Sequence, residues 1–98
     1  MFRHVVMFRW AEGTAESDRQ AALAALREFG REIAGLGALQ VGADAGVSAG
    51  NFDTVVVVDF PDADSYREYA VDPRHVALIA RYIKPFLAER AAVQTELA

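Results

Sequence analysis

Cysteine is absent from the 98-residue chain, and its absence excludes several kinds of chemistry at once. Without thiols there is no disulfide framework, no thiolate zinc site and no cysteine nucleophile. Blocks of like charge are missing as well, and the net charge is −4. Phosphate binding and attachment to an anionic membrane surface both need clustered lysine and arginine. We therefore expect neither a nucleic-acid partner nor a membrane partner.

Long apolar runs are also lacking. The valine run Val55–Val58 is too short to span a bilayer. Charges interrupt the first ten residues, which therefore lack the continuous apolar region of a signal peptide. A chain of this length has room for one domain. We expect a single cytoplasmic domain over residues 1–98.

Apolar residues, in contrast, are abundant and make up 53% of the chain, above the usual share of about 45–50%. Alanine accounts for part of the surplus, but phenylalanine, tyrosine and valine supply more apolar surface than a small monomer needs. Large exposed apolar patches are uncommon on monomers. The composition therefore favours a buried subunit interface, with an unusually apolar core as the alternative.

Apolar periodicity predicts the order of the secondary structure. Residues 2–10 alternate as in a strand, with His4, Val6 and Phe8 on one face. Four consecutive valines in residues 52–60 indicate a strand that is buried on both faces. The expected elements are strand 2–10, helix 14–34, strand 38–43, strand 52–60, helix 62–69, helix 72–87 and strand 91–97. This order is the ferredoxin-like pattern of an α+β protein.

Several residues are expected to begin or end helices. Thr14 is a predicted N-cap, and Gly35 is a predicted C-cap. Asp72-Pro73 combines the favoured N-cap residue with the favoured first helical residue, and Pro85 is expected to kink that helix or mark its last turns. The apolar face of this last helix is expected to carry Val76, Ile79, Ala80, Ile83 and Leu87.

The residues at the corners of these elements carry a family resemblance. The most specific segment is Tyr69–Val76, which follows the pattern Tyr-x-x-His/Asp-Pro-x-His-Val. The segments His4–Phe8, Val41–Gly42, Asp59–Asp62 and Pro85–Phe86 fit the same family in order and spacing. Together they resemble the Dabb family, the stress-responsive dimeric A/B barrel domains, over essentially the whole chain.

The resemblance implies a homodimer in which two four-stranded sheets face each other and the helices cover the outside, as a dimeric α/β barrel. On that basis we expect Val5, Met7, Val55 and Val57 to meet the partner. The opposite side of the sheet would hold a pocket for a small, partly apolar or oxygenated ligand. The residues expected to line it are His4, Val6, Phe8, Thr54, Val56 and Val58.

Two side chains are candidates for catalysis. His75 follows Asp72-Pro73 in a first helical turn, where the positive helix end lowers the imidazole pKa, and a neutral imidazole can act as a general base. The Tyr69 phenol can donate to a developing enolate oxygen, provided that the backbone bends at Asp72-Pro73. Structural alternatives stay open: His75 as packing at a helix start, Tyr69 with its hydroxyl in solvent, and His4 as a satisfied buried histidine.

The resemblance implies roles for the same pair. Olivetolic acid cyclase, a plant member of the family, closes a polyketide ring by aldol condensation, and its base and its carbonyl-binding tyrosine align with His75 and Tyr69. Thr54 stands where that enzyme has another pocket histidine, and threonine cannot shuttle a proton at neutral pH. Two hypotheses follow: a ligand-binding dimer, or a cyclase- or lyase-like enzyme.

No cofactor or metal is expected from the side chains. The chain has two histidines, far apart, without the spacing of a transition-metal site. The resemblance adds two alternatives: a magnesium ion held by backbone groups at the dimer interface, and haem on His75. We favour neither.

Overall fold

The computed structural model describes all 98 residues and contains one four-stranded antiparallel sheet. The strands are β1 (Phe2–Trp10), β2 (Ala38–Ala43), β3 (Thr54–Phe60) and β4 (Leu87–Glu96), in the spatial order β2-β3-β1-β4. The helices are α1 (Glu16–Glu32), α2 (Ala63–Val71) and α3 (Pro73–Leu78). A π-helical turn, η1 (Ile79–Ile83), and a 3₁₀ turn, η2 (Lys84–Phe86), connect α3 to β4. The ferredoxin-like α+β fold is thereby confirmed.

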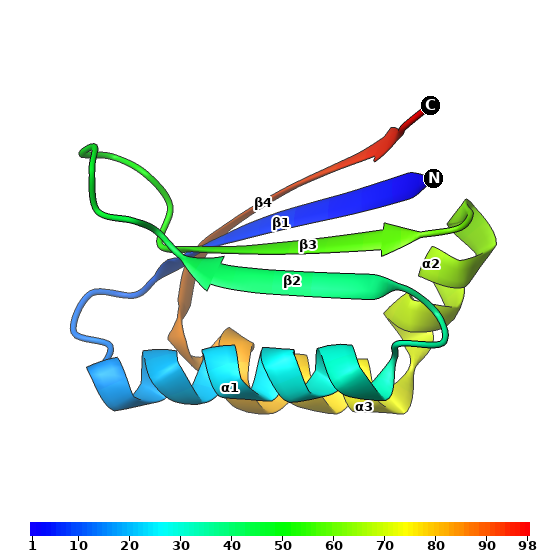
Figure 1. Cartoon of the computed structure of the whole chain (residues 1–98). Helices are drawn as coiled ribbons and strands as arrows, with labels where there is room; N and C mark the ends of the chain where they lie inside the picture. Colours follow the sequence, from blue (N-terminus) through cyan, green and yellow to red (C-terminus); the bar gives the residue numbers. More distant parts are fainter.

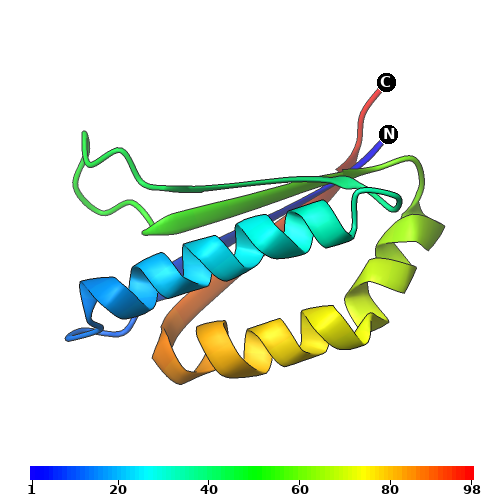
Figure 2. The ribbon, with the colours of Figure 1, turned by 60° about the horizontal axis from the view of Figure 1, so that its bottom comes forward.

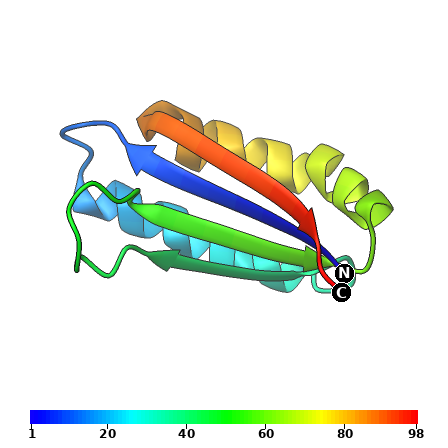
Figure 3. The same ribbon diagram turned by 90° about the horizontal axis from the view of Figure 1, so that it is seen from above.

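All the helices lie on one side of the sheet. Figure 1 shows α1 and α3 beneath the strands, with α2 closing one end. Turning the molecule brings α1 and the α2–α3 arm forward as two separate rows that cover the sheet (Figure 2). From the opposite direction the strands lie in front and no helix crosses them (Figure 3). None of the helices has the length and apolar character required to cross a membrane.

The strand register explains which side chains face the helices. His4 pairs with Val58, Val6 with Val56, and Phe8 with Thr54, so each pair projects from the same face. All six side chains are buried against the helices. The predicted inward face of β1 and β3 is therefore confirmed.

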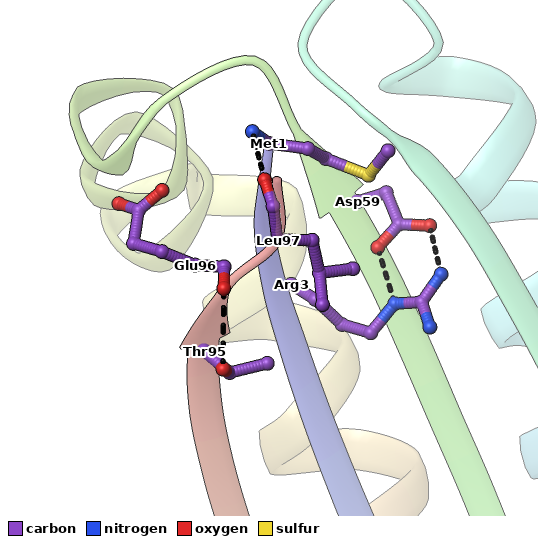
Figure 4. A network of polar contacts seen from close by, with 6 residues as sticks. All are labelled: Met1, Arg3, Asp59, Thr95, Glu96 and Leu97. Carbon is purple, nitrogen blue, oxygen red and sulfur yellow. Dashed lines mark hydrogen bonds and ion pairs between the residues drawn. The ribbon is translucent and has the colours of Figure 1, made fainter.

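The other face of the sheet, which we call the open face, contains the alternate residues. Val5 pairs with Val57 and Met7 with Val55, and Val55 remains 37% exposed. At one end of this face, Arg3 donates two hydrogen bonds to the Asp59 carboxylate, at 2.7 and 2.9 Å (Figure 4). The hydrogen bonds from Arg3 lower the pKa of Asp59. The open face is therefore apolar in the middle with an ion pair near one end.

Two predicted helix caps are wrong. The Thr14 hydroxyl donates to the Ala11 carbonyl at 2.6 Å, which stabilises the preceding turn, and α1 begins only at Glu16. At the other end α1 stops at Glu32, and the C-cap is buried Ile33, whose φ of −100° and ψ of 14° are no longer helical, so Gly35 is not the C-cap. Asp62 and Asp72, in contrast, accept hydrogen bonds from the first turns of α2 and α3, and the predicted N-cap role of Asp72 is thereby confirmed.

The last helix and the strands beside it also differ from expectation. Val76 is 56% exposed and Ala80 is exposed, while Leu78 is buried in their place. The turn that follows, η1, is π-helical and holds more residues than an α-helical turn. Strand β4 begins at Leu87 rather than Ala91, since it pairs with β1 as far as Trp10. Strand β3 begins at Thr54 rather than Phe52, because the Asp53 carboxylate accepts from the Trp10 amide instead.

Gly37 permits close contact between the α1–β2 turn and the core. A Cβ atom at this position would lie 2.7 Å from Cδ1 of Phe60 and 2.9 Å from the Asp59 carbonyl oxygen. Phe60 is 1% exposed and has no room to move. Nearby Gly35 has nothing within 4 Å of the corresponding position. The requirement for glycine at position 37 is therefore steric.

We predict that Gly37→Ala lowers the free energy of unfolding by about 1–3 kcal/mol, because the added methyl group overpacks a filled core. Gly35→Ala is the matched control and should change it by less than about 0.5 kcal/mol. Urea unfolding at fixed protein concentration measures both. Equal stability of the two variants would contradict the packing around Gly37.

Candidate functional site

The bend between α2 and α3 brings the two predicted catalytic residues together. A residue that precedes proline is pushed away from helical backbone angles, and Asp72, before Pro73, has an extended ψ of 127°. Helix α2 therefore ends at Val71 and α3 begins in a new direction. Across this bend the rings of Tyr69 and His75 lie 4.5 Å apart between centroids.

Asp72 fixes the bend. Its carboxylate accepts from the Arg74 amide at 2.8 Å and from the Arg74 guanidinium at 2.8 and 3.0 Å. The side-chain hydrogen bond from Arg74, followed by the backbone one, lowers the pKa of Asp72 to about 2. The carboxylate stays ionised at neutral pH, so it is a structural cap rather than a proton donor.

The hydrogen bonds of His75 determine its tautomer. Its Nδ1 lies 3.2 Å from the Ala70 carbonyl oxygen. A carbonyl oxygen only accepts, so Nδ1 carries the proton and Nε2 keeps its lone pair. Burial lowers the pKa of His75, against the opposing effects of the Ala70 carbonyl and Asp72. The direction was predicted, but burial is the leading cause rather than the helix dipole.

His4 has the opposite tautomer. The Gln94 amide nitrogen donates to Nδ1 of His4 at 3.1 Å, which leaves the proton on Nε2. Burial, together with the charges of Arg90 and His75, lowers the pKa of His4 to about 4. At neutral pH His4 is therefore an uncharged side chain with an N–H donor at Nε2.

Tyr69 completes a set of three polar groups. It is 4% exposed and lies among Phe29, Phe60 and His75. Burial is the main reason that the pKa of Tyr69 rises to about 12, so the phenol is a proton donor at neutral pH. Its hydroxyl makes no hydrogen bond within the protein. Every fully buried side-chain nitrogen or oxygen does have a hydrogen-bond partner. The hydroxyl is therefore accessible rather than sealed in the core.

These groups surround a cavity of about 250 Å³ between the sheet and the helices. Tyr69, His75 and His4 line it, and apolar side chains make up most of the remaining wall. Typical ligand pockets occupy about 300–1,000 Å³, so this one suits a small molecule. The full lining is His4, Val6, Phe8, Leu26, Val56, Tyr66, Tyr69, His75, Ile79, Ile83, Lys84, Leu87 and Arg90.

Most of the predicted pocket residues are brought together here, but two are not. His4, Val6, Phe8 and Val56 lie in the wall, whereas Thr54 does not. The Thr54 hydroxyl instead accepts from the Trp10 indole N–H at 3.2 Å, at the far end of β3. Val58 is fully buried outside the lining.

Sequence reasoning missed the contribution of the last turns and of β4. Ile79 and Ile83 lie four residues apart on the cavity side, and the wide π-helical turn keeps them nearly in line. Lys84 and Arg90 add two cations to the lining. A correct start for β4 would have placed Arg90 opposite Phe8, and so on the same face. The described residues contain no cluster of three or more His, Cys, Asp or Glu side chains that fits a metal ion.

Comparisons with known proteins agree on the fold. A dimeric ferredoxin-like protein of unknown function from Thermobifida fusca YX is 38% identical, with a TM-score of 0.89 over 98% of this chain and 90% of that one. A Dabb family protein from Mesorhizobium loti is 17% identical, with a TM-score of 0.82 over 99% and 96% of the two chains. The hydroxynitrile lyase of Passiflora edulis is 16% identical, with a TM-score of 0.82 over 99% and 93%. A search of the curated proteins found no match.

The family assignment follows from the sequence as well as from the fold. The family described as Stress responsive A/B Barrel Domain matches residues 2–97, which include every strand and helix and the whole cavity lining. The Tyr69–Val76 segment, which carried the resemblance, forms the bend beside the cavity. The chain belongs to the Dabb family of stress-responsive A/B barrel domains.

Proposed function

We propose that this protein is a single-domain homodimer that binds one small, partly apolar ligand per subunit in the helix-side cavity. The cavity itself carries the proposal, because a mostly apolar wall with a few convergent polar groups is the usual design of a ligand site. Tyr69 and His4 supply hydrogen-bond donors and His75 supplies an acceptor. A ligand with an oxygen or nitrogen function on an apolar body fits this set.

The open face supports the dimer. Val5, Met7, Val55 and Val57 lie next to one another in the register, and no helix covers them. Exposed apolar patches of this kind mark interfaces. The Thermobifida fusca protein, at 38% identity, is described as dimeric. Association through the open face would bury these valines and leave the helix-side cavity on the outer layer.

A second candidate function is proton transfer next to a carbonyl group. The observation that favours it is the lone pair on Nε2 of His75, which lies beside the Tyr69 ring. His75 would remove a proton from a carbon next to the carbonyl, and the electron pair would move to the oxygen, where Tyr69 donates. Aldol-type cyclases use this step. The Passiflora edulis lyase shares only the fold at 16% identity, so its reaction does not carry over by likeness alone.

We predict that Val57→Asp converts the dimer to a monomer, because two buried carboxylates near the subunit boundary would lack compensating partners. Light scattering at micromolar concentration measures the mass. Val71→Asp is the matched control, since Val71 is 75% exposed on the helix side, and it should stay dimeric. A wild-type monomer at this concentration, or a dimeric Val57→Asp variant, would contradict association through the open face.

Phenylacetone tests binding and proton transfer in one sample. We predict that it shifts the NMR resonances of the cavity residues, and that the protein in D₂O exchanges its benzylic protons faster than buffer does. His75→Ala should slow the catalysed exchange by about 10²-fold and Tyr69→Phe by a similar factor, since one removes the base and the other the oxyanion donor. Tyr82→Phe, outside the cavity lining, should leave the rate unchanged.

The outcomes separate the two functions. Cavity shifts without catalysed exchange would support ligand binding and remove the proton-transfer mechanism. Catalysed exchange that survives His75→Ala would remove His75 as the base. The binding function itself would be overturned if phenylacetone, benzoate and benzamide all failed to shift any cavity resonance.

A further inference from the structure

The charged side chains in the lining of the cavity are all of one sign. The lining includes two basic side chains, Lys84 and Arg90, and no aspartate or glutamate. The two histidines beside them are uncharged at neutral pH, since burial lowers both imidazole pKa values. The cavity therefore carries a net positive charge on an otherwise mostly apolar surface.

The chain reversal into β4 places both cations. Lys84 begins the 3₁₀ turn η2, and three residues later the chain enters β4 at Leu87. Arg90 pairs with Phe8 across the β1–β4 ladder, so its side chain projects from the helix side of the sheet, as Phe8 does. The two cations thus reach the cavity from one edge, where η2 meets β4.

Neither cation is neutralised within the subunit. The five ion pairs of the protein use other cations, and neither Lys84 nor Arg90 makes a side-chain hydrogen bond. Glu89 precedes Arg90 but projects from the opposite side of β4, where it pairs with Arg9 at 3.9 Å. After burial, the charge of Arg90 also contributes to the lowered pKa values of His4 and His75, and it partly offsets the raised pKa of Tyr69, as expected for a cation near all three groups.

We propose that the natural ligand is a small apolar acid whose carboxylate lies at Lys84 and Arg90 while its apolar body fills the cavity. This inference rests on the proposed ligand-binding function and names its ligand class. A single carboxylate suits the arrangement, because the volume of about 250 Å³ leaves little room beside the apolar body for a larger anionic group. The donors at Tyr69 and His4 remain available for a second oxygen of the same ligand.

Benzoate and benzamide test this proposal, since they have nearly the same shape and differ in charge. We predict that benzoate binds about tenfold more tightly, the sum of two partly exposed charge contacts. NMR titration measures both affinities and shows that the shifts occur at cavity residues. Added salt should weaken benzoate binding and leave benzamide binding unchanged.

Two double variants separate a local charge contact from a general charge effect. Lys84→Gln/Arg90→Gln should lose the preference for benzoate and keep the affinity for benzamide. Arg67→Gln/Arg81→Gln changes the net charge equally at positions outside the cavity lining and should keep the preference.

The same titrations distinguish failure of the inference from failure of the proposed function. Benzamide binding in the cavity as tightly as benzoate would overturn the carboxylate site and leave ligand binding intact. A benzoate preference that survives Lys84→Gln/Arg90→Gln would also overturn it. An absence of cavity shifts with benzoate, benzamide and phenylacetone would overturn both proposals together.

Discussion

The backbone of Asp72 is held outside the helical region because Pro73 follows it, and the geometry of the site depends on that single constraint. Tyr69 and His75 are six residues apart in the sequence. Had α2 continued as a straight helix, they would lie on different faces of it. The bend instead brings their rings to 4.5 Å and directs the His75 Nδ1 proton to the Ala70 carbonyl, at the end of the preceding helix. Local sterics therefore determine both the placement and the tautomer of the candidate base.

The proposed assembly and the proposed ligand chemistry lie on opposite faces of the sheet. Alternation along β1 and β3 sends His4, Val6 and Phe8 toward the helices and Val5 and Met7 toward the open face. A change on one face therefore alters the other only through the backbone. Substitutions in the cavity can therefore change its chemistry without changing the side chains of the open face.

Much of the fold was predictable because its signals are local. Alternation marked β1, and the Asp72-Pro73 pair marked a helix start that the structure confirms. Features set by long-range contacts were not predictable. The start of β4 depends on pairing with Trp10, and the steric role of Gly37 depends on Phe60, which lies far along the chain.

The candidate site divides in the same way. His4, Tyr69 and His75 could be named from the sequence, because the strand face and the signature segment mark them. Thr54 was predicted to line the cavity but does not. Alternation along a strand identifies the face of a side chain, but it does not show that Thr54 accepts a hydrogen bond from Trp10. Arg90 was overlooked because β4 was predicted to begin after it, at Ala91. The positive charge of the cavity was therefore not predicted either.

The most direct test of this account is the protonation of the two imidazoles, measured by ¹⁵N NMR of the histidine side chains at pH 7. With two histidines in the chain, the signals are simple to assign by substituting one of them. The account predicts neutral rings of opposite tautomer, with the proton on Nδ1 of His75 and on Nε2 of His4. A proton on Nε2 of His75, or a charged His75 ring, would leave the cavity without a base and contradict the arrangement of the site.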